Sequence, residues 1–265
     1  MERLLGANCE CIRGVDPAET LRMMHEVGFT SYFAGAHDAK NLARIKSVGD
    51  SLGMTIRTIH APFDNINSLW MHGVSCRSLY KRILASIDAV ADVGIPGIVL
   101  HVSSGWRPPE INDLGLSRYD AIVEYAADKG IKVAFENLRL VGNLAYLADR
   151  YRSVENVGFC YDFGHGHCYT PSVMWMDIFR NRLFSTHIHD NLGIKEEYEE
   201  HTDIHYLPFD GDMDYVPIMR ALDLYGYTGD LTLEISNAKR PEYEAMAPIE
   251  FLRTAHERLD RLARL

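Results

Sequence analysis

The residues best suited to chemistry stand at the ends of short apolar segments. Segment 183–191 begins apolar and ends in His187, His189, Asp190 and Asn191. If it is a strand, alternate side chains share a face, so the two histidines lie together and the acidic residue follows the strand end. A lone buried histidine is usually a hydrogen-bonded core residue, but the same pattern recurs along the chain. We therefore interpret this segment as part of a functional site.

Other strand-like segments also end in histidine or in an acidic residue. In chain order the strand-end residues are His60, His101, Glu136, Asp162, His187 and Glu234. Carboxylates and imidazoles together are the ligands of divalent cations such as Zn²⁺ or Mn²⁺. Carboxylates this close would repel one another, and a bound cation removes the repulsion. We favour a metal site over a metal-free acid/base site.

Two neighbouring segments supply further donors. His165 follows Asp162 by three residues, and Asp203 and His205 lie in the loop after segment 183–191. Each signal is weak alone, because acidic residues and histidines in loops are usually solvated. Together with the strand ends they exceed what one ion needs, so a site for two or three ions is an alternative to a single-ion site.

Strand and helix signals alternate along the chain, and their order predicts how these residues are positioned. Apolar strand-like segments and amphipathic helix-like segments form eight strand-then-helix units without a linker. Expected strands are 3–9, 30–36, 54–60, 98–102, 132–136, 157–161, 183–191 and 230–235. Expected helices are 17–27, 39–52, 79–93, 117–129, 143–152, 173–181, 215–225 and 241–265. Such alternation implies parallel strands with right-handed crossovers.

Eight units in 265 residues match a closed (β/α)₈ TIM barrel, and we expect one such domain over residues 1–265. In that barrel the strand-end side chains converge on one mouth. A doubly wound open sheet is the alternative. It is disfavoured because no first turn carries a GxGxxG motif and because the polar residues follow strands all along the chain.

Composition and charge disfavour some classes of partner and cellular location. The chain is 47% hydrophobic and carries a net charge of −10, which disfavours nucleic acid as a partner. Five cysteines without a CxxC pair indicate free thiols in a reducing compartment. The start has no signal-like apolar run, and no segment reaches the roughly 18 apolar residues of a membrane span. We expect a cytoplasmic protein without a membrane partner.

Over nearly its full length the chain resembles the xylose isomerase-like TIM barrels. This superfamily contains sugar isomerases and epimerases, inosose dehydratases and the endonuclease IV type of apurinic endonuclease. The motifs that carry the resemblance occur in order at strand ends. They are Ile59-His-Ala-Pro-Phe63, Leu100-His101, Phe135-Glu-Asn137, Asp162-Phe-Gly-His165, His187-Ile-His-Asp-Asn191, Asp203-Ile-His205 with Gly211, and Leu233-Glu234.

The resemblance implies two ligand sets. In the epimerase branch one metal is held by two glutamates, an aspartate and a histidine, and the matching residues here are Glu136, Glu234, Asp162 and His187. His187 is preferred over His189 because an acid, here Asp190, follows the family's histidine by three positions. Asp190 itself is then expected to orient its neighbours. In the endonuclease branch a trinuclear zinc site also uses residues that match His60, His101, His165, Asp203 and His205.

The function implied is a metal-dependent sugar or sugar-phosphate isomerase or epimerase that acts through a metal-stabilised enediolate. One Mn²⁺, Zn²⁺ or Mg²⁺ ion is expected, with up to three as the alternative. Glu136 and Glu234 are candidate catalytic bases as well as ligands. For contacts with a small sugar or polyol substrate we assign His165, His189 and Trp106. Gly193 stands where ketose 3-epimerases carry an arginine, so their particular substrate does not transfer.

Three other functions stay open on sequence. An endonuclease IV-like zinc phosphodiesterase has its ligands, but the acidic run 195–200 near the mouth would repel DNA. A dehydratase or lyase on a cyclic polyol or keto acid could use the same ligands. A sugar-binding subunit without activity would be expected to lose ligands, and none is missing. A homo-oligomer is compatible with the sequence.

Overall fold

Eight parallel strands form a barrel in the computed structural model, which describes residues 3–194 and 203–265. The strands are β1 (Leu5–Asn8), β2 (Ser31–Ala34), β3 (Thr55–His60), β4 (Gly97–Leu100), β5 (Lys132–Glu136), β6 (Val157–Asp162), β7 (Leu183–His187) and β8 (Leu231–Leu233). Sequential strands are neighbours, and β8 pairs with β1. Between β7 and β8 the barrel closes through Ile188, whose N–H donates to Thr232 O at 2.8 Å. The predicted (β/α)₈ barrel is confirmed.

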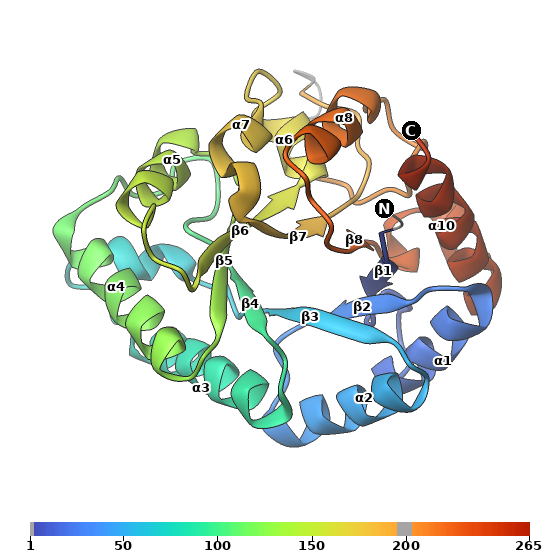
Figure 1. The fold of residues 1–265 in the computed structure, drawn as a ribbon, viewed down its shortest axis with the longest axis horizontal. Helices are drawn as coiled ribbons and strands as arrows, with labels where there is room; N and C mark the ends of the chain where they lie inside the picture. The colour runs from blue at the N-terminus through green and yellow to red at the C-terminus, as the bar shows by residue number, and fades with distance from the viewer. Residues whose placement is uncertain (1–2, 195–202) are drawn as a thin grey trace.

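Helices surround the ring of strands (Figure 1). They are α1 (Pro17–Val27), α2 (Ala39–Ser51), α3 (Arg77–Val93), α4 (Asp113–Asp128), α5 (Val141–Arg150), α6 (Phe163–Tyr169), α7 (Trp175–Phe179), α8 (Val216–Leu224), α9 (Pro241–Glu244) and α10 (Pro248–Ala263). Local sequence explains their ends. Asp16 caps α1 by accepting from Ala18 N, Pro17 occupies the first helical position, and Gly28 ends the helix in the left-handed conformation.

Several elements differ from their expected bounds: strand β7 ends at His187 rather than at 191, α7 is shorter than 173–181, and α4 begins at Asp113 rather than at 117. Two further regions differ in kind. The segment after Asp162, for which no helix was expected, forms helix α6, and Asp162 caps it by accepting from His165 N at 2.6 Å. The C-terminal helix is not continuous from Pro241, because α9 ends at Glu244 and α10 begins at Pro248. Proline has no N–H to donate and fits the first turn of a helix, so it starts the second helix rather than continuing the first.

The core fills the barrel and the space between strands and helices. Trp70 and Trp175 are almost fully buried and donate their indole N–H groups to Val102 O and Thr170 Oγ1, so neither can stack on a sugar. Cys9 and Cys11 are buried beyond the end of β1, and burial raises the pKa of both thiols. These side chains therefore pack the fold.

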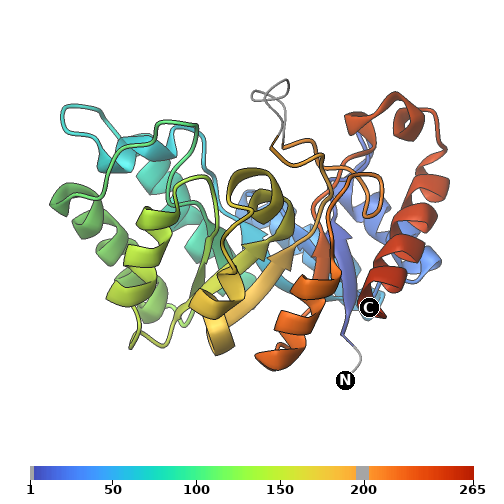
Figure 2. The same ribbon diagram turned by 90° about the horizontal axis from the view of Figure 1, so that it is seen from above.

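The two ends of the barrel differ. Figure 2 shows the chain termini toward one end and the long strand-to-helix loops at the other. Because every strand runs in the same direction, the carboxyl ends of all strands meet at the loop end, which is where TIM barrels carry their sites.

Candidate metal centre

The carboxyl ends of the strands bring the predicted ligands together. His60, Glu136, Asp162 and His187 are the last residues of β3, β5, β6 and β7. His101 and Glu234 come directly after β4 and β8, one residue outside the strands in which they were expected. Within the described part of the chain, three groups have ligand atoms within 4.8 Å of one another. They are His60, His101 and Glu136; Glu136, Asp162, His187 and Glu234; and His165, His189, Asp203 and His205.

Glu136 lies at the centre of this arrangement. Its Oε2 is 3.1 Å from His101 Nε2 and 3.3 Å from His60 Nε2. Its Oε1 is 3.2 Å from His165 Nδ1 and 3.4 Å from His187 Nδ1. The side chain is fully buried. Glu136 therefore belongs to two groups and links all three.

Backbone carbonyls orient three of the histidines. The Nδ1 atoms of His60, His165 and His205 lie within hydrogen-bond distance of carbonyl oxygens, which can only accept, so Nδ1 carries the proton. The carbonyls belong to Ala61, Asn137 and Glu234, at 2.7, 3.0 and 2.8 Å. Nε2 is then the ring atom that can bind a metal ion, and His60 Nε2 faces His101 Nε2 at 3.1 Å. An outer partner that fixes the ring in this way is typical of metal-binding histidines.

Several buried ligand atoms have no hydrogen-bond partner among the described residues. They are His101 Nδ1, Asp162 Oδ2, His187 Nε2, both ring nitrogens of His189, and Asp203 Oδ1. An unsatisfied buried polar atom costs about 1–3 kcal/mol. Carboxylate and imidazole atoms collected at this density are the donor set of Zn²⁺ and similar ions. The residues fit a divalent metal.

The carboxylates at the centre hold their charge despite burial. Burial raises the pKa of Glu136, but the imidazoles of His187 and His101 outweigh it and hold the pKa well below its ordinary value. Burial likewise raises the pKa of Asp162 and of Asp203, and neighbouring histidines again prevail and lower it. The centre therefore keeps negative charge that cations must balance.

Histidines supply that balance in the protein without ions. Burial lowers the pKa of His165, but Asp162 and Asp203 outweigh it and raise the pKa well above its ordinary value. Burial also lowers the pKa of His205, and Asp203 raises it to about 9 overall. Protons on these rings occupy the positions that a divalent cation would take, so metal binding would release them.

Asp190 holds the loop that carries Asp203 and His205. Its backbone pairs with Tyr206 through two hydrogen bonds of 2.8 and 2.9 Å. Its carboxylate accepts from backbone N–H groups of Asn191 and Phe209 at 2.8 Å and of Met213 at 3.3 Å. Asp190 is in none of the three groups of described residues. The orienting role expected for it agrees with these contacts.

His189 lies deeper than a substrate contact requires. The side chain is fully buried, with Nε2 3.2 Å from Asp162 Oδ1 and its ring stacked 3.9 Å from that of His205. Gly164 leaves room for the ring, since a Cβ there would lie 1.9 Å from His189 Cε1. This position favours contact with the other candidate metal ligands. The contact of His189 with a substrate stays a prediction.

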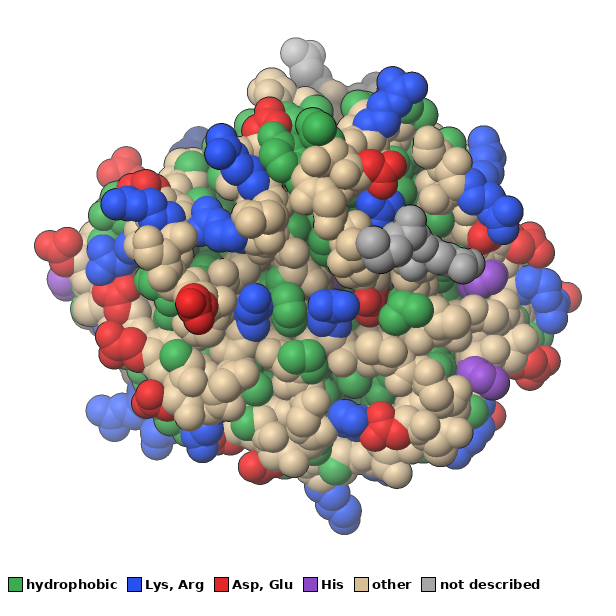
Figure 3. Space-filling model, viewed as in Figure 1, with side chains coloured by type: hydrophobic (Ala, Val, Ile, Leu, Met, Phe, Trp, Pro, Cys, Tyr) green, Lys and Arg blue, Asp and Glu red, His purple; other side chains and the backbone are tan. Residues whose placement is uncertain are grey.

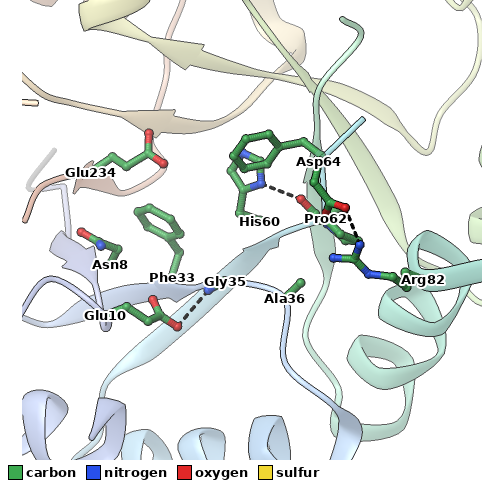
Figure 4. A pocket seen from close by; sticks show the side chains of 12 residues that line it. Asn8, Glu10, Phe33, Gly35, Ala36, His60, Pro62, Asp64, Arg82 and Glu234 are labelled. Atoms are coloured by element: carbon green, nitrogen blue, oxygen red, sulfur yellow. Dashed lines mark hydrogen bonds and ion pairs between the residues drawn. The ribbon is translucent and has the colours of Figure 1, made fainter. Parts of the chain in front are cut away.

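Two neighbouring cavities are lined by ligand residues. The larger, of about 370 Å³, is lined by Glu10, Phe33, His60 and Glu234 among others, and Figure 4 shows these side chains around it. The smaller, of about 160 Å³, includes His101, His165, Asp203 and His205. His60, Phe63 and Glu234 line both. Trp106 is 54% exposed and is not among the lining residues, so its substrate contact also stays a prediction.

Glu10 lines the larger cavity and was not predicted from the sequence. Its Oε1 accepts from Gly35 N at 3.0 Å and lies 2.6 Å from His37 Nε2. This contact raises the pKa of His37. The available signal was an acidic residue two positions after the first strand, on the same side of the barrel as the other strand-end groups.

Comparisons with known proteins agree with this geometry. A family model described as "Xylose isomerase-like TIM barrel" matches residues 13–255. Protein y4fM of Sinorhizobium fredii, whose function is uncharacterized, is 32% identical over 182 residues, which cover 63% of this chain and 56% of that protein. The chain thus matches little more than half the length of this relative.

Solved structures share the fold. The 3-keto-D-glucoside 4-epimerase YcjR from E. coli is 18% identical with a TM-score of 0.74, and all of both chains is covered. The IOLI protein with a bound zinc atom is 15% identical with a TM-score of 0.79, and 98% of each chain is covered.

Proposed function

The chain belongs to the xylose isomerase-like TIM barrel family, and from this premise we propose that it is a metal-dependent isomerase or epimerase of a sugar or sugar phosphate. The observation that carries the proposal is the group Glu136, Asp162, His187 and Glu234, which combines metal ligands with an acid/base residue open to a cavity. Epimerases among the similar structures support it.

Glu136, Asp162, His187 and Glu234 would hold the ion. A divalent cation there would supply Lewis acidity that polarises a sugar carbonyl and its adjoining hydroxyl and so acidifies the intervening C–H bond. Asn137 fixes this part of the site, because its side chain exchanges two hydrogen bonds of 2.8 Å with the backbone of Asp162. The ends of β5 and β6 are thereby held at a constant separation.

The two glutamates differ in access. Glu234 has a side chain that is 23% exposed and lines both cavities, whereas Glu136 is fully buried and surrounded by histidines. We therefore assign Glu234 as the base that takes the proton from the carbon beside the carbonyl, and Glu136 as a ligand. Return of the proton to the neighbouring carbon, with the hydroxyl proton passing to the former carbonyl oxygen, gives an isomer. An epimer requires a second group that delivers a proton to the opposite face of the same carbon, the role for which Glu136 is the other candidate.

Solvent proton exchange tests this assignment. Purified protein with Mn²⁺ is incubated in D₂O with a panel of ketoses, aldoses and polyols, and deuterium incorporation is followed by NMR. We expect incorporation beside the carbonyl of the true substrate and a loss of about a hundredfold or more in Glu234→Gln. Glu124→Gln makes the same chemical change at an exposed position on α4 and should retain full activity. Full activity in Glu234→Gln would refute the assignment.

A multinuclear phosphodiesterase is the second candidate. It is favoured by the three ligand groups, two of which share Glu136 and which together contain every residue predicted for a trinuclear zinc site. Three divalent ions would carry six positive charges against the four carboxylates of these groups, and the excess would suit a phosphate.

The surface charge favours the first candidate. The net charge of −10 opposes binding to the phosphate backbone of DNA. Figure 3 shows the end of the barrel away from the strand-to-helix loops, where basic and acidic side chains are interspersed. Elemental analysis separates the two functions. One ion per chain supports the isomerase, whereas three zinc ions with cleavage of an abasic oligonucleotide would reverse the ranking.

The expected setting of the enzyme is also a proposal. Among the described residues, no helix is long and apolar enough to cross a membrane. A small sugar or polyol substrate and a cytoplasmic location are proposed from the sequence and the family. A dehydratase or lyase stays an alternative that uses the same ligands.

A further inference from the structure

Arg139 is a cation placed at the mouth of the candidate site. It follows β5 by three residues and lines the smaller cavity together with His165, Asp203 and His205. Arg82 lines the larger cavity but forms an ion pair of 2.7 Å with Asp64. For Arg139 no carboxylate lies within 4.0 Å among the residues that the structure describes.

Aromatic rings hold the guanidinium of Arg139 in place. Its Cζ lies 3.9 Å from the ring centroid of Tyr169 and 5.0 Å from that of Trp106. Nη2 also donates to the hydroxyl of Tyr169. Tyr169 in turn stacks on His165, with 5.4 Å between ring centroids. The guanidinium is therefore fixed one ring away from a candidate metal ligand.

Two other nitrogens of this guanidinium have no hydrogen-bond partner among the described residues. Nε is buried with no acceptor, and Nη1 has no hydrogen-bond partner in the described part of the chain. Ordering a charged group while Nε and Nη1 have no acceptor is costly. A planar guanidinium stacked on aromatic rings is the group that proteins use for bidentate recognition of phosphate and carboxylate.

We propose that Arg139 binds an oxyanion of the substrate, a phosphate or a carboxylate, while the rest of the substrate extends over His165 toward Glu234. This deepens the proposed function and rests on it in taking the substrate to be a sugar derivative. The substrate class is then a sugar phosphate or a sugar acid rather than a neutral sugar. Trp106 acts through Arg139 as a positioning residue, which explains why it lies beside the cavity and not in its wall.

Calorimetric titration tests the proposal with two probes, inorganic phosphate and D-gluconate. The protein is used as purified, with its metal content measured for every variant. Arg139→Met keeps the length of the side chain and removes its charge, and we expect about a tenfold or greater loss of affinity for at least one probe. Arg107→Met is the matched control, because Arg107 is exposed in the same loop as Trp106 and lines neither cavity. Its affinities should stay within about twofold of wild type.

Each outcome decides the proposal. Loss for phosphate indicates a sugar phosphate, and loss for gluconate alone indicates a sugar acid. The proposal is overturned if wild type binds neither probe at about 10 mM. It is also overturned if Arg139→Met binds both probes with wild-type affinity, or if Arg107→Met loses as much affinity as Arg139→Met does. If Arg139→Met fails to fold or loses metal, Arg139→Gln repeats the test with the same expectation. Binding needs no turnover, so a failed proton-exchange assay would refute the isomerase and leave this result standing.

Discussion

Replacing Asp190 with asparagine should loosen the loop that delivers Asp203 and His205 to the site. The Asp190 carboxylate accepts from three backbone N–H groups, two at Oδ1 and one at Oδ2. In Asp190→Asn one oxygen becomes an NH₂ group, so in either orientation at least one N–H loses its acceptor and faces another donor. The change in volume is negligible, which isolates the hydrogen-bonding effect.

The size of the effect follows from these contacts. A hydrogen bond to a charged group contributes about 1.5–3 kcal/mol. Part of the loss is recovered because burial raises the pKa of Asp190, which shows that the charged form is partly disfavoured there. We expect a loss of about 2 kcal/mol in the free energy of unfolding and a fall in melting temperature on the order of 5 °C.

Urea denaturation of the chelator-treated protein measures the stability, and metal titration measures the site. Metal affinity of the group that contains Asp203 and His205 should fall, while the group around Glu136 keeps its ion. The control is Asp214→Asn in the same loop, where an exposed carboxylate accepts from Val216 N at 3.0 Å, a bond that the amide oxygen of asparagine can also accept. A stability loss in Asp190→Asn no larger than in this control would refute the reasoning.

Three further predictions follow from the site. Gly164→Ala should cost about 1–3 kcal/mol of stability in thermal denaturation, because its Cβ would meet the His189 ring at 1.9 Å, whereas Gly142→Ala in α5 meets nothing within 4 Å and should cost nothing. The pKa of His205 is raised to about 9, so protonation of His205 stabilises the metal-free fold below pH 6.5 and this contribution is lost as the pH rises through 9. Metal affinity should rise over the same range. A melting temperature of the metal-free protein that does not change between pH 6.5 and 9.5 would contradict this. Glu10→Gln should lower kcat/KM about tenfold with unchanged metal content; an unaltered kcat/KM would remove Glu10 from the substrate cavity's function.

Local sequence was sufficient for the order of the elements. Most strands are short apolar runs closed by a polar residue, and caps such as Asp16 and Gly28 mark the ends of α1. The convergence of the strand-end residues also followed, because parallel strands in a barrel must bring their carboxyl ends to the same end. These features depend on neighbours in the chain and on the direction of the strands, both of which can be read from the sequence.

Helix α6 shows where local signals fail. Its sequence contains Gly164 and Gly166, which disfavour a helix, yet the Asp162 cap and burial of Phe163 stabilise it. The break before Pro248 was readable in principle, since proline commonly begins a helix.

The sequence by itself determined the fold and the types of residue at the mouth, whereas the tertiary structure decided their grouping. Strand register and loop packing set whether two side chains meet, and neither is encoded within a short segment. For that reason the sequence could not show that Glu136 lies at the centre of the ligands. It also could not show that the ring of His189 stacks on that of His205. The same holds for Arg139, whose role depends on the ring of Trp106 from another loop and the ring of Tyr169 from helix α6.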